Sequence, residues 1–177
     1  MHSTSIARQP DWTPPRPPLY SAQERARRDA SAWTVVQGIL APLQFLVFAI
    51  SLVLVLRYLV TGEGWVAACV SFVAKTALLY TIMVTGSLWE KDVFGRYLFA
   101  PAFFWEDAVS MVVIALHTAY LVALLWGVGT PREQMLIALA AYATYVVNAA
   151  QFLLKLRAAR RQDAVRQARS MGLAPSE

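Results

Sequence analysis

The stretch VVQGILAPLQFLVFAISLVLVLRY, residues 35–58, decides the fold because its one charged side chain, Arg57, stands close to its end. A helix crosses the hydrocarbon core of a bilayer with about 20 apolar residues, and this stretch is longer. Three more stretches have the same apolar character and lie at residues 65–88, 103–126 and 133–156. The sequence therefore predicts an all-α fold, an integral membrane bundle of four transmembrane helices.

The overall composition agrees with this prediction. Of the 177 residues, 58% are hydrophobic and 15% are charged, whereas soluble domains average about 45–50% and about 25%. The net charge of +5 comes from basic residues that flank the apolar stretches, which excludes the polar basic patch of a nucleic-acid-binding protein. Residues 1–30 lack the apolar segment of a cleavable signal peptide. The lone Cys69 excludes an intrachain disulfide.

The apolar stretches divide the chain into three parts. Residues 1–32 form a cytoplasmic tail rich in Pro and Arg, residues 33–157 form the four-helix transmembrane domain, and residues 158–177 form a basic cytoplasmic tail. Within the first tail, the sequence PPRPP at residues 14–18 favours an extended polyproline conformation. Residues 21–29 are expected to form a short polar helix.

Basic residues predict the orientation of the bundle, because loops on the cytoplasmic side carry more Lys and Arg. With four spans, one side of the membrane receives most of them: Arg8, Arg16, Arg25, Arg27, Arg28, Lys91, Arg96, Lys155, Arg157, Arg160, Arg161, Arg166 and Arg169. The other side receives Arg57 and Arg132. We therefore expect the N and C termini on the cytoplasmic side.

Polar side chains inside the spans are candidates for function, because burying them in lipid is unfavourable. Gln37, Gln44 and Ser51 are spaced seven apart and share one helix face. They form either a helix-packing seam or the polar wall of a cavity. Lys75, near the middle of the second span, requires water or a partner, for example in a structural ion pair.

The third and fourth spans add further polar groups. Glu106 and His117 are eleven residues apart, about three turns, and therefore face the same way. His117 is either a satisfied packing residue or part of a functional stripe. In the fourth span, Thr144, Asn148, Gln151 and Lys155 lie on one flank near the cytoplasmic end.

Acidic residues gather near the connection between the second and third spans, at the predicted cytoplasmic side. They are Glu90, Asp92, Glu106 and Asp107, interleaved with Trp89, Phe94, Phe99, Phe103, Phe104 and Trp105. One interpretation is a solvated loop anchored at the lipid headgroups. Alternatively, apolar surroundings keep a carboxyl protonated, so that it acts as a general acid. The sequence contains no conventional metal site or nucleophile triad.

Four stretches resemble the chlorophyllide 3-vinyl hydratase family, also called 2-vinyl bacteriochlorophyllide hydratase. They are ASAWTVVQGILAPLQF (30–45), GSLWEKDVFG (86–95), LFAPAFFWED (98–107) and YATYVVNAAQF (142–152), and the resemblance extends over about residues 20–160. It implies a hydro-lyase of bacteriochlorophyll biosynthesis in the inner or intracytoplasmic membrane. The enzyme would add water to the 3-vinyl group of chlorophyllide a or 3-vinyl bacteriochlorophyllide a, giving the 3-(1-hydroxyethyl) pigment. It would need no cofactor, since the substrate carries its own magnesium.

The resemblance also suggests roles for residues. Glu106 is expected to be the acid and Asp107 or Glu90 the base, while His117 is either a base or a contact of the chlorin magnesium. Substrate contacts are expected from Gln37, Gln44, Lys75, Trp89, Lys91, Arg96, Trp105, Asn148 and Gln151. In this set, Lys91 or Arg96 would hold the propionate, and Trp89 and Trp105 would stack on the macrocycle.

Two other classes of protein remain alternatives at this point. A non-catalytic membrane protein that binds or assembles pigment would show an axial His and aromatic packing, but it would not need clustered acids. A small transporter or quinone-site subunit is less favoured, because the inverted repeats of many transporters are not evident. The expected partners are the pigment substrate and the lipid bilayer, together with a second copy of the chain or other pigment-biosynthesis enzymes.

Overall fold

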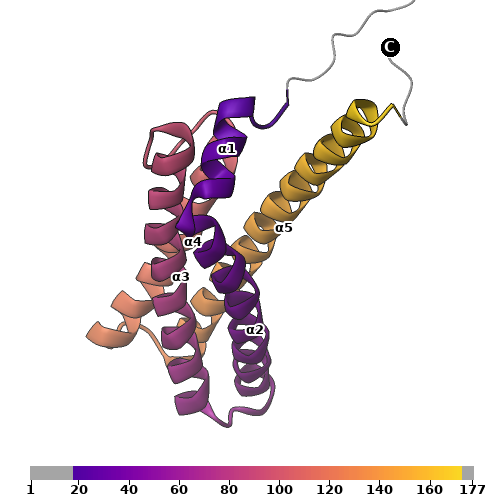
Figure 1. The fold of residues 1–177 in the computed structure, drawn as a ribbon. Coiled ribbons are helices and arrows are strands. Elements are labelled where there is room, and N and C mark those ends of the chain that lie inside the picture. The colour runs from indigo at the N-terminus through magenta and orange to yellow at the C-terminus, as the bar shows by residue number, and fades with distance from the viewer. Residues whose placement is uncertain (1–17, 173–177) are drawn as a thin grey trace, which may run out of the picture.

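A computed structural model describes residues 18–172, without the side chains of residues 169 and 170. The described part of the chain is helical throughout apart from short connections (Figure 1). The helices are α1 (Ala22–Ala30), α2 (Ala32–Thr61), α3 (Trp65–Phe94), α4 (Phe104–Trp126) and α5 (Pro131–Ser170). The predicted polyproline stretch falls almost wholly on residues 1–17, outside the described residues.

Four of these helices, α2 to α5, are long and apolar enough to cross a membrane. The predicted four-helix bundle is thereby confirmed among the described residues. The helices run past the predicted apolar spans: α3 continues to Phe94, and α5 continues without a break to Ser170. Polar residues at the ends of a span continue the helix into water, because the backbone hydrogen bonds do not depend on side-chain polarity.

The helices pair as two antiparallel hairpins. α2 packs mainly on α3 and α4 mainly on α5, while contacts between α2 and α5 help to join the hairpins. Gly62 and Gly127 end α2 and α4 in left-handed backbone conformations, with φ of 76° and 65°. A residue without Cβ adopts this conformation at little cost, so the two hairpin turns are short.

Polar side chains of α2 make contacts between helices inside the bundle. Gln37 Nε2 donates to Thr85 Oγ1 on α3 at 2.8 Å. Ser51 is fully buried, accepts a hydrogen bond from Tyr142 OH at 2.6 Å and lies 2.7 Å from Ser71 Oγ. Such contacts are typical of membrane helix interfaces, as the packing interpretation of this face predicts.

The predicted short polar helix is confirmed as α1. Ser21 and Glu24 form a reciprocal capping box at its start. Tyr20, just before it, is buried against Phe94 with ring centroids 5.8 Å apart, and the guanidinium of Arg28 lies over its ring. Burial raises the pKa of Tyr20 to about 12.

α1 also contacts the far end of α5. Arg25 and Arg28 both lie within ion-pair distance of Asp163, at 3.7 and 3.6 Å. The backbone N–H of Leu19 donates to the side chain of Gln162 at 3.2 Å. α1 therefore links the end of α3 to the extension of α5, at the end of the bundle where α4 begins (Figure 1).

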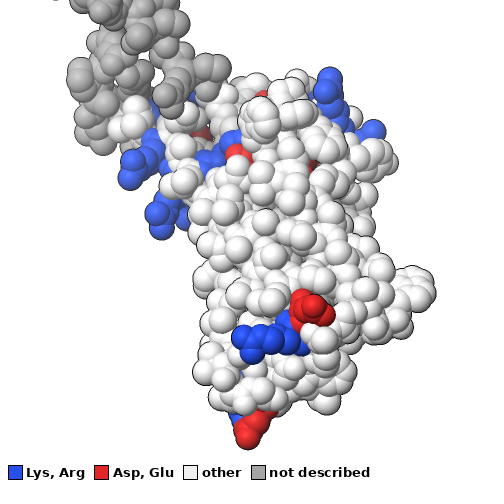
Figure 2. All heavy atoms as spheres, turned by 180° about the vertical axis from the view of Figure 1, so that it is seen from behind, with Lys and Arg blue, Asp and Glu red and all other residues white. Residues whose placement is uncertain are grey.

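The charged side chains lie mainly near the two ends of the molecule. Figure 2 shows a wide band without Lys, Arg, Asp or Glu between a charged upper end and a smaller charged group below. Many exposed residues on the spans are large and apolar, among them Ile39, Val53, Val70, Val112 and Leu136. Such a surface fits lipid around the middle of the bundle.

Candidate functional site

Three acidic side chains are buried together where α3 ends and α4 begins. Glu90, Glu106 and Asp107 are 5%, 6% and 3% exposed. Glu90 lies in the last turns of α3, whereas Glu106 and Asp107 lie in the first turn of α4. The connection between the two helices folds over them, so the interpretation of these three acids as a solvated loop is wrong.

Glu90 and Asp107 form a direct carboxyl pair. Their side chains interact, and because two neighbouring carboxylates repel each other, a proton on one of them is favoured. The connecting loop adds two backbone donors: Phe99 N–H to Asp107 Oδ2 at 2.7 Å and Ala100 N–H to Glu90 Oε2 at 3.2 Å. The same loop thereby holds both carboxyls.

The loop adopts an unusual backbone conformation to make these contacts. Phe99 has φ of 58°, a left-handed value that is uncommon for a residue other than glycine. Such strain is kept only where the surroundings hold the residue in place. Here Phe99 directs its N–H at Asp107, so the strained residue helps to position that carboxyl.

Glu106 has a different partner, Lys155 of α5. The Lys155 ammonium forms an ion pair with the Glu106 carboxylate and also donates to the carbonyl of Ala102. Glu106 also lies in the first turn of α4, where the helix dipole is favourable to a negative charge. We use the term acid cluster for Glu90, Glu106, Asp107 and Lys155.

A line of polar side chains leads from the acid cluster into the bundle. Ser110 Oγ donates to the carbonyl of Glu106, and Asn148 Nδ2 donates to Ser110 Oγ at 2.8 Å. Asn148 Oδ1 and Gln151 Oε1 are buried and lack a hydrogen-bond partner among the described residues. These two acceptors are therefore available to water or to a ligand.

Comparison with known proteins identifies the family. Residues 20–158 match the family described as 2-vinyl bacteriochlorophyllide hydratase (BCHF). The chain belongs to this family. It is 68% identical over 151 residues to the 2-vinyl bacteriochlorophyllide hydratase of Rhodobacter capsulatus, covering 85% of this chain and 88% of that protein. The protein of the same name from Cereibacter sphaeroides is 72% identical over 143 residues, covering 80% and 88%.

No solved structure matches the chain. The family resemblance and the enzyme class predicted from the sequence are confirmed: this member of the hydratase family is a hydro-lyase of bacteriochlorophyll biosynthesis. The two alternatives, a non-catalytic pigment-binding protein and a small transporter, are set aside by this result.

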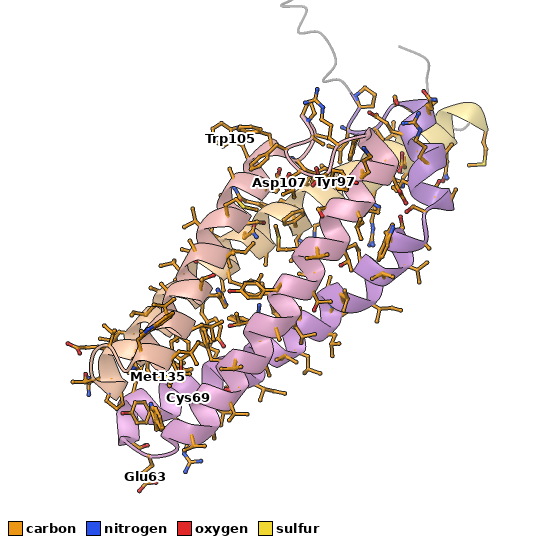
Figure 3. The ribbon with its side chains drawn as sticks, turned by 90° about the vertical axis from the view of Figure 1, so that its left-hand side faces the viewer. Glu63, Cys69, Tyr97, Trp105, Asp107 and Met135 are labelled. Carbon is orange, nitrogen blue, oxygen red and sulfur yellow. The ribbon has the colours of Figure 1, made fainter. Side chains whose placement is uncertain are left out.

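Several residues expected at the site of this family member lie apart from the acid cluster. Trp105 is 72% exposed and points away from the bundle, whereas Asp107 lies between the helices (Figure 3). Lys91 and Arg96 are exposed near the end of α3, and the Lys91 ammonium lies 4.8 Å from the ring centroid of Tyr97. Their contact with a propionate stays a prediction.

Trp89 and Gln44 lie inside the fold. Trp89 packs edge-on against Phe103, with ring centroids 5.6 Å apart, and its Nε1 donates to Thr34 Oγ1. Trp89 therefore packs among the aromatic side chains next to the acid cluster. Gln44 is buried on α2 at 4% exposure, while Asp92, the fourth predicted acid, is exposed and accepts a hydrogen bond from Ser31.

Lys75 has no ion-pair partner among the described residues, so of the two possibilities its contact with water or substrate stays a prediction. Its Nζ is fully buried, lies 3.8 Å from the ring centroid of Tyr145 and has no hydrogen-bond partner among the described residues. His117 is also fully buried and stacks on Phe72, three turns of α4 from Glu106. The Lys75 ammonium and the His117 ring are thus buried polar groups near the middle of the bundle.

Proposed function

We propose that the chain adds water across the 3-vinyl group of chlorophyllide a or 3-vinyl bacteriochlorophyllide a, and that the acid cluster carries the reaction. The observation that supports this is the burial of the Glu90 and Asp107 carboxyls together, next to Glu106 and its partner Lys155. Protonation of an alkene requires a positioned acid that still carries its proton near neutral pH, and shielding from water keeps a carboxylic acid in that protonated form. The product is the 3-(1-hydroxyethyl) pigment.

The reaction then proceeds in two steps. The carboxylic acid of Glu90 transfers its proton to the terminal vinyl carbon, and the positive charge that forms at the inner carbon spreads into the macrocycle. Water attacks the inner carbon and loses a proton to the carboxylate pair, which restores the initial state. Atoms balance as one water added per vinyl group, with no oxidation or reduction.

The remaining members of the cluster stabilise the cation. One proton on three carboxyl groups leaves two carboxylates, and Lys155 neutralises one of them. The cluster therefore has one negative charge in excess, placed where positive charge develops on the substrate. Glu106, expected from the sequence to be the acid, is paired with Lys155, whereas Glu90 lies beside another carboxyl, and this difference supports Glu90 as the donor instead.

We expect the acid cluster to face the cytoplasm, in the inner or intracytoplasmic membrane. It lies at the end of the bundle that also holds α1 and the α5 extension, where most of the described Lys and Arg residues stand. Glu63, in the turn between α2 and α3, marks the opposite end (Figure 3).

Labelling of single cysteines tests the orientation. In a Cys69→Ser background, Glu63→Cys should react with a membrane-impermeant maleimide in intact spheroplasts. Asp92→Cys should react only after the membrane is opened, because both side chains are exposed but at opposite ends. The reverse pattern would place both termini outside and overturn the proposed orientation.

The function itself is tested by pigment conversion. Membranes that contain the chain, incubated with chlorophyllide a, should yield a product heavier by one water, with its red absorption band shifted to the blue. Membranes from the same host without the chain serve as the control. Unchanged chlorophyllide a and unchanged 3-vinyl bacteriochlorophyllide a in parallel reactions would contradict the proposal.

A further inference from the structure

Two buried amide oxygens of α5, Asn148 Oδ1 and Gln151 Oε1, lack hydrogen-bond partners among the residues that the structure describes. Residues three apart in a helix stand next to each other on one face, so the two amides are neighbours. The Asn148 side chain is almost fully buried, at 7% exposure. α5 therefore presents a pair of acceptors to the interior of the bundle.

Contacts on either side of this pair fix its position against α4. Asn148 Nδ2 donates to Ser110 Oγ at 2.8 Å, and Lys155 of the acid cluster lies one turn beyond Gln151. Because α4 and α5 run antiparallel, the residue three positions after Asn148 stands opposite the residue three positions before Ser110. Gln151 therefore lies at the level of Asp107, beside the acid cluster.

The donors near the pair are directed elsewhere. The Ser110 hydroxyl donates to the carbonyl of Glu106, and the Lys155 ammonium donates to the Glu106 carboxylate and to the carbonyl of Ala102. Ionised carboxylates only accept hydrogen bonds, so they offer the pair no donor. Buried acceptors left in this way are commonly satisfied by an internal water. A water also needs far less room than a macrocycle, so it is compatible with the close packing around the pair.

We propose that Asn148 Oδ1 and Gln151 Oε1 hold the water that attacks the inner vinyl carbon, an inference that rests on the proposed function. This role differs from the contact with the pigment that the sequence suggested for both residues. A water that donates its two hydrogens to the two amide oxygens points its lone pairs away from α5. After Glu90 has protonated the terminal carbon, such a lone pair forms the bond to the inner carbon.

The attacking water then loses one proton. Bond formation makes its oxygen positive, and a neutral amide is too weak a base to remove the proton. The hydrogen held by Gln151 passes instead to the carboxylate pair at the same level, and the hydrogen held by Asn148 stays on the product hydroxyl. The acid cluster thereby regains the proton that Glu90 gave to the vinyl group.

Deuterium exchange tests this role separately from protonation. In D2O the carboxylic acid delivers deuterium to the terminal carbon, and a cation that water does not capture returns to the vinyl pigment by losing a proton to the carboxylate. The recovered chlorophyllide a then carries deuterium at its terminal vinyl carbon. Mass spectrometry measures both the exchanged and the hydrated pigment, and the ratio of the two does not depend on the amount of folded chain.

Gln151→Met and Asn148→Leu remove the amides and keep nearly the same volume. Each is expected to slow capture of the cation by water about tenfold to a hundredfold, because the water is no longer held in position, and to raise the ratio of exchange to hydration by that factor. Gln134→Met is the matched control. Gln134 also has a buried Oε1 without a partner in the described part of the chain, but it stands at the opposite end of α5, so this variant should keep the ratio of the unmodified chain.

A raised ratio in both variants, with the ratio of Gln134→Met unchanged, supports the water site. An unchanged ratio in either Gln151→Met or Asn148→Leu would overturn it, because the amide would then act through pigment binding or packing. Complete loss of both reactions in these variants has the same consequence. Absence of hydration and exchange in the unmodified chain would instead contradict the proposed function.

Discussion

Replacing Glu90 with glutamine is expected to lower hydratase activity by about 10²–10⁴-fold, the contribution typical of a positioned general acid. The amide has nearly the same shape and still accepts the N–H of Ala100, but it has no acidic proton for the vinyl carbon. Pigment binding should change little, because the substitution removes a proton donor and preserves the volume of the site. The measurement is the initial rate of water addition to chlorophyllide a, with the pigment affinity determined separately.

Asp92→Asn is the control for this variant. Asp92 stands two residues further along α3, is exposed and lies outside the acid cluster. The substitution makes the same change from carboxyl to amide and should retain the activity of the unmodified chain. Glu106→Gln separates the two possible donors: if it abolishes the reaction while Glu90→Gln remains active, Glu106 is the acid, as expected from the sequence.

The sequence predicts the spans because their length and lack of charge are local properties. Four apolar stretches separated by short polar connections leave little choice of fold. The same pattern predicts that Glu90, Glu106 and Asp107 meet, since an even number of spans brings the end of α3 and the start of α4 to one side. Proximity that depends only on chain connectivity could thus be predicted without coordinates.

Contacts between distant residues could not be predicted in this way. Lys155 pairs with Glu106 across 49 positions, and nothing local to either residue indicates the other. For Lys75 the sequence indicated only a need for water or a partner, and the rotation of its helix places Tyr145 at the ammonium. The outward direction of Trp105 depends on where α4 begins, because one residue along a helix changes the direction of a side chain by about 100°.

The packing of α1 is a further set of contacts between residues that are distant in the sequence. Its capping box is visible in four consecutive residues, so the helix itself could be predicted. Its packing against α3 and α5 depends on the burial of Tyr20 and on Asp163, which the sequence does not connect. The structure thereby shows that a segment expected to be a separate tail contacts the helices that carry the acid cluster.

Replacing Lys155 with methionine is expected to lower the free energy of unfolding by about 3 kcal/mol. Removal of one partner from a buried ion pair costs about 3–5 kcal/mol, because the other charge stays buried without compensation. Glu106 is almost fully buried, whereas the Lys155 side chain is 23% exposed, which places the effect at the low end of this range. Methionine keeps most of the aliphatic volume, so lost packing contributes little.

The double variant Lys155→Met/Glu106→Gln separates the ion pair from other effects of the substitution. It removes both charges, and its stability should exceed that of Lys155→Met alone, since an amide is far less costly to bury than an unpaired carboxylate. The control is Arg157→Met, which changes an exposed basic residue two positions further along α5 and should change stability by less than about 0.5 kcal/mol.

Unfolding in mixed detergent and SDS micelles, followed by tryptophan fluorescence, measures the stability of the three variants and the unmodified chain. Equal stability of Lys155→Met and the unmodified chain would mean that water solvates Glu106, and the acid cluster would then lack the buried charge on which the stabilisation of the cation depends.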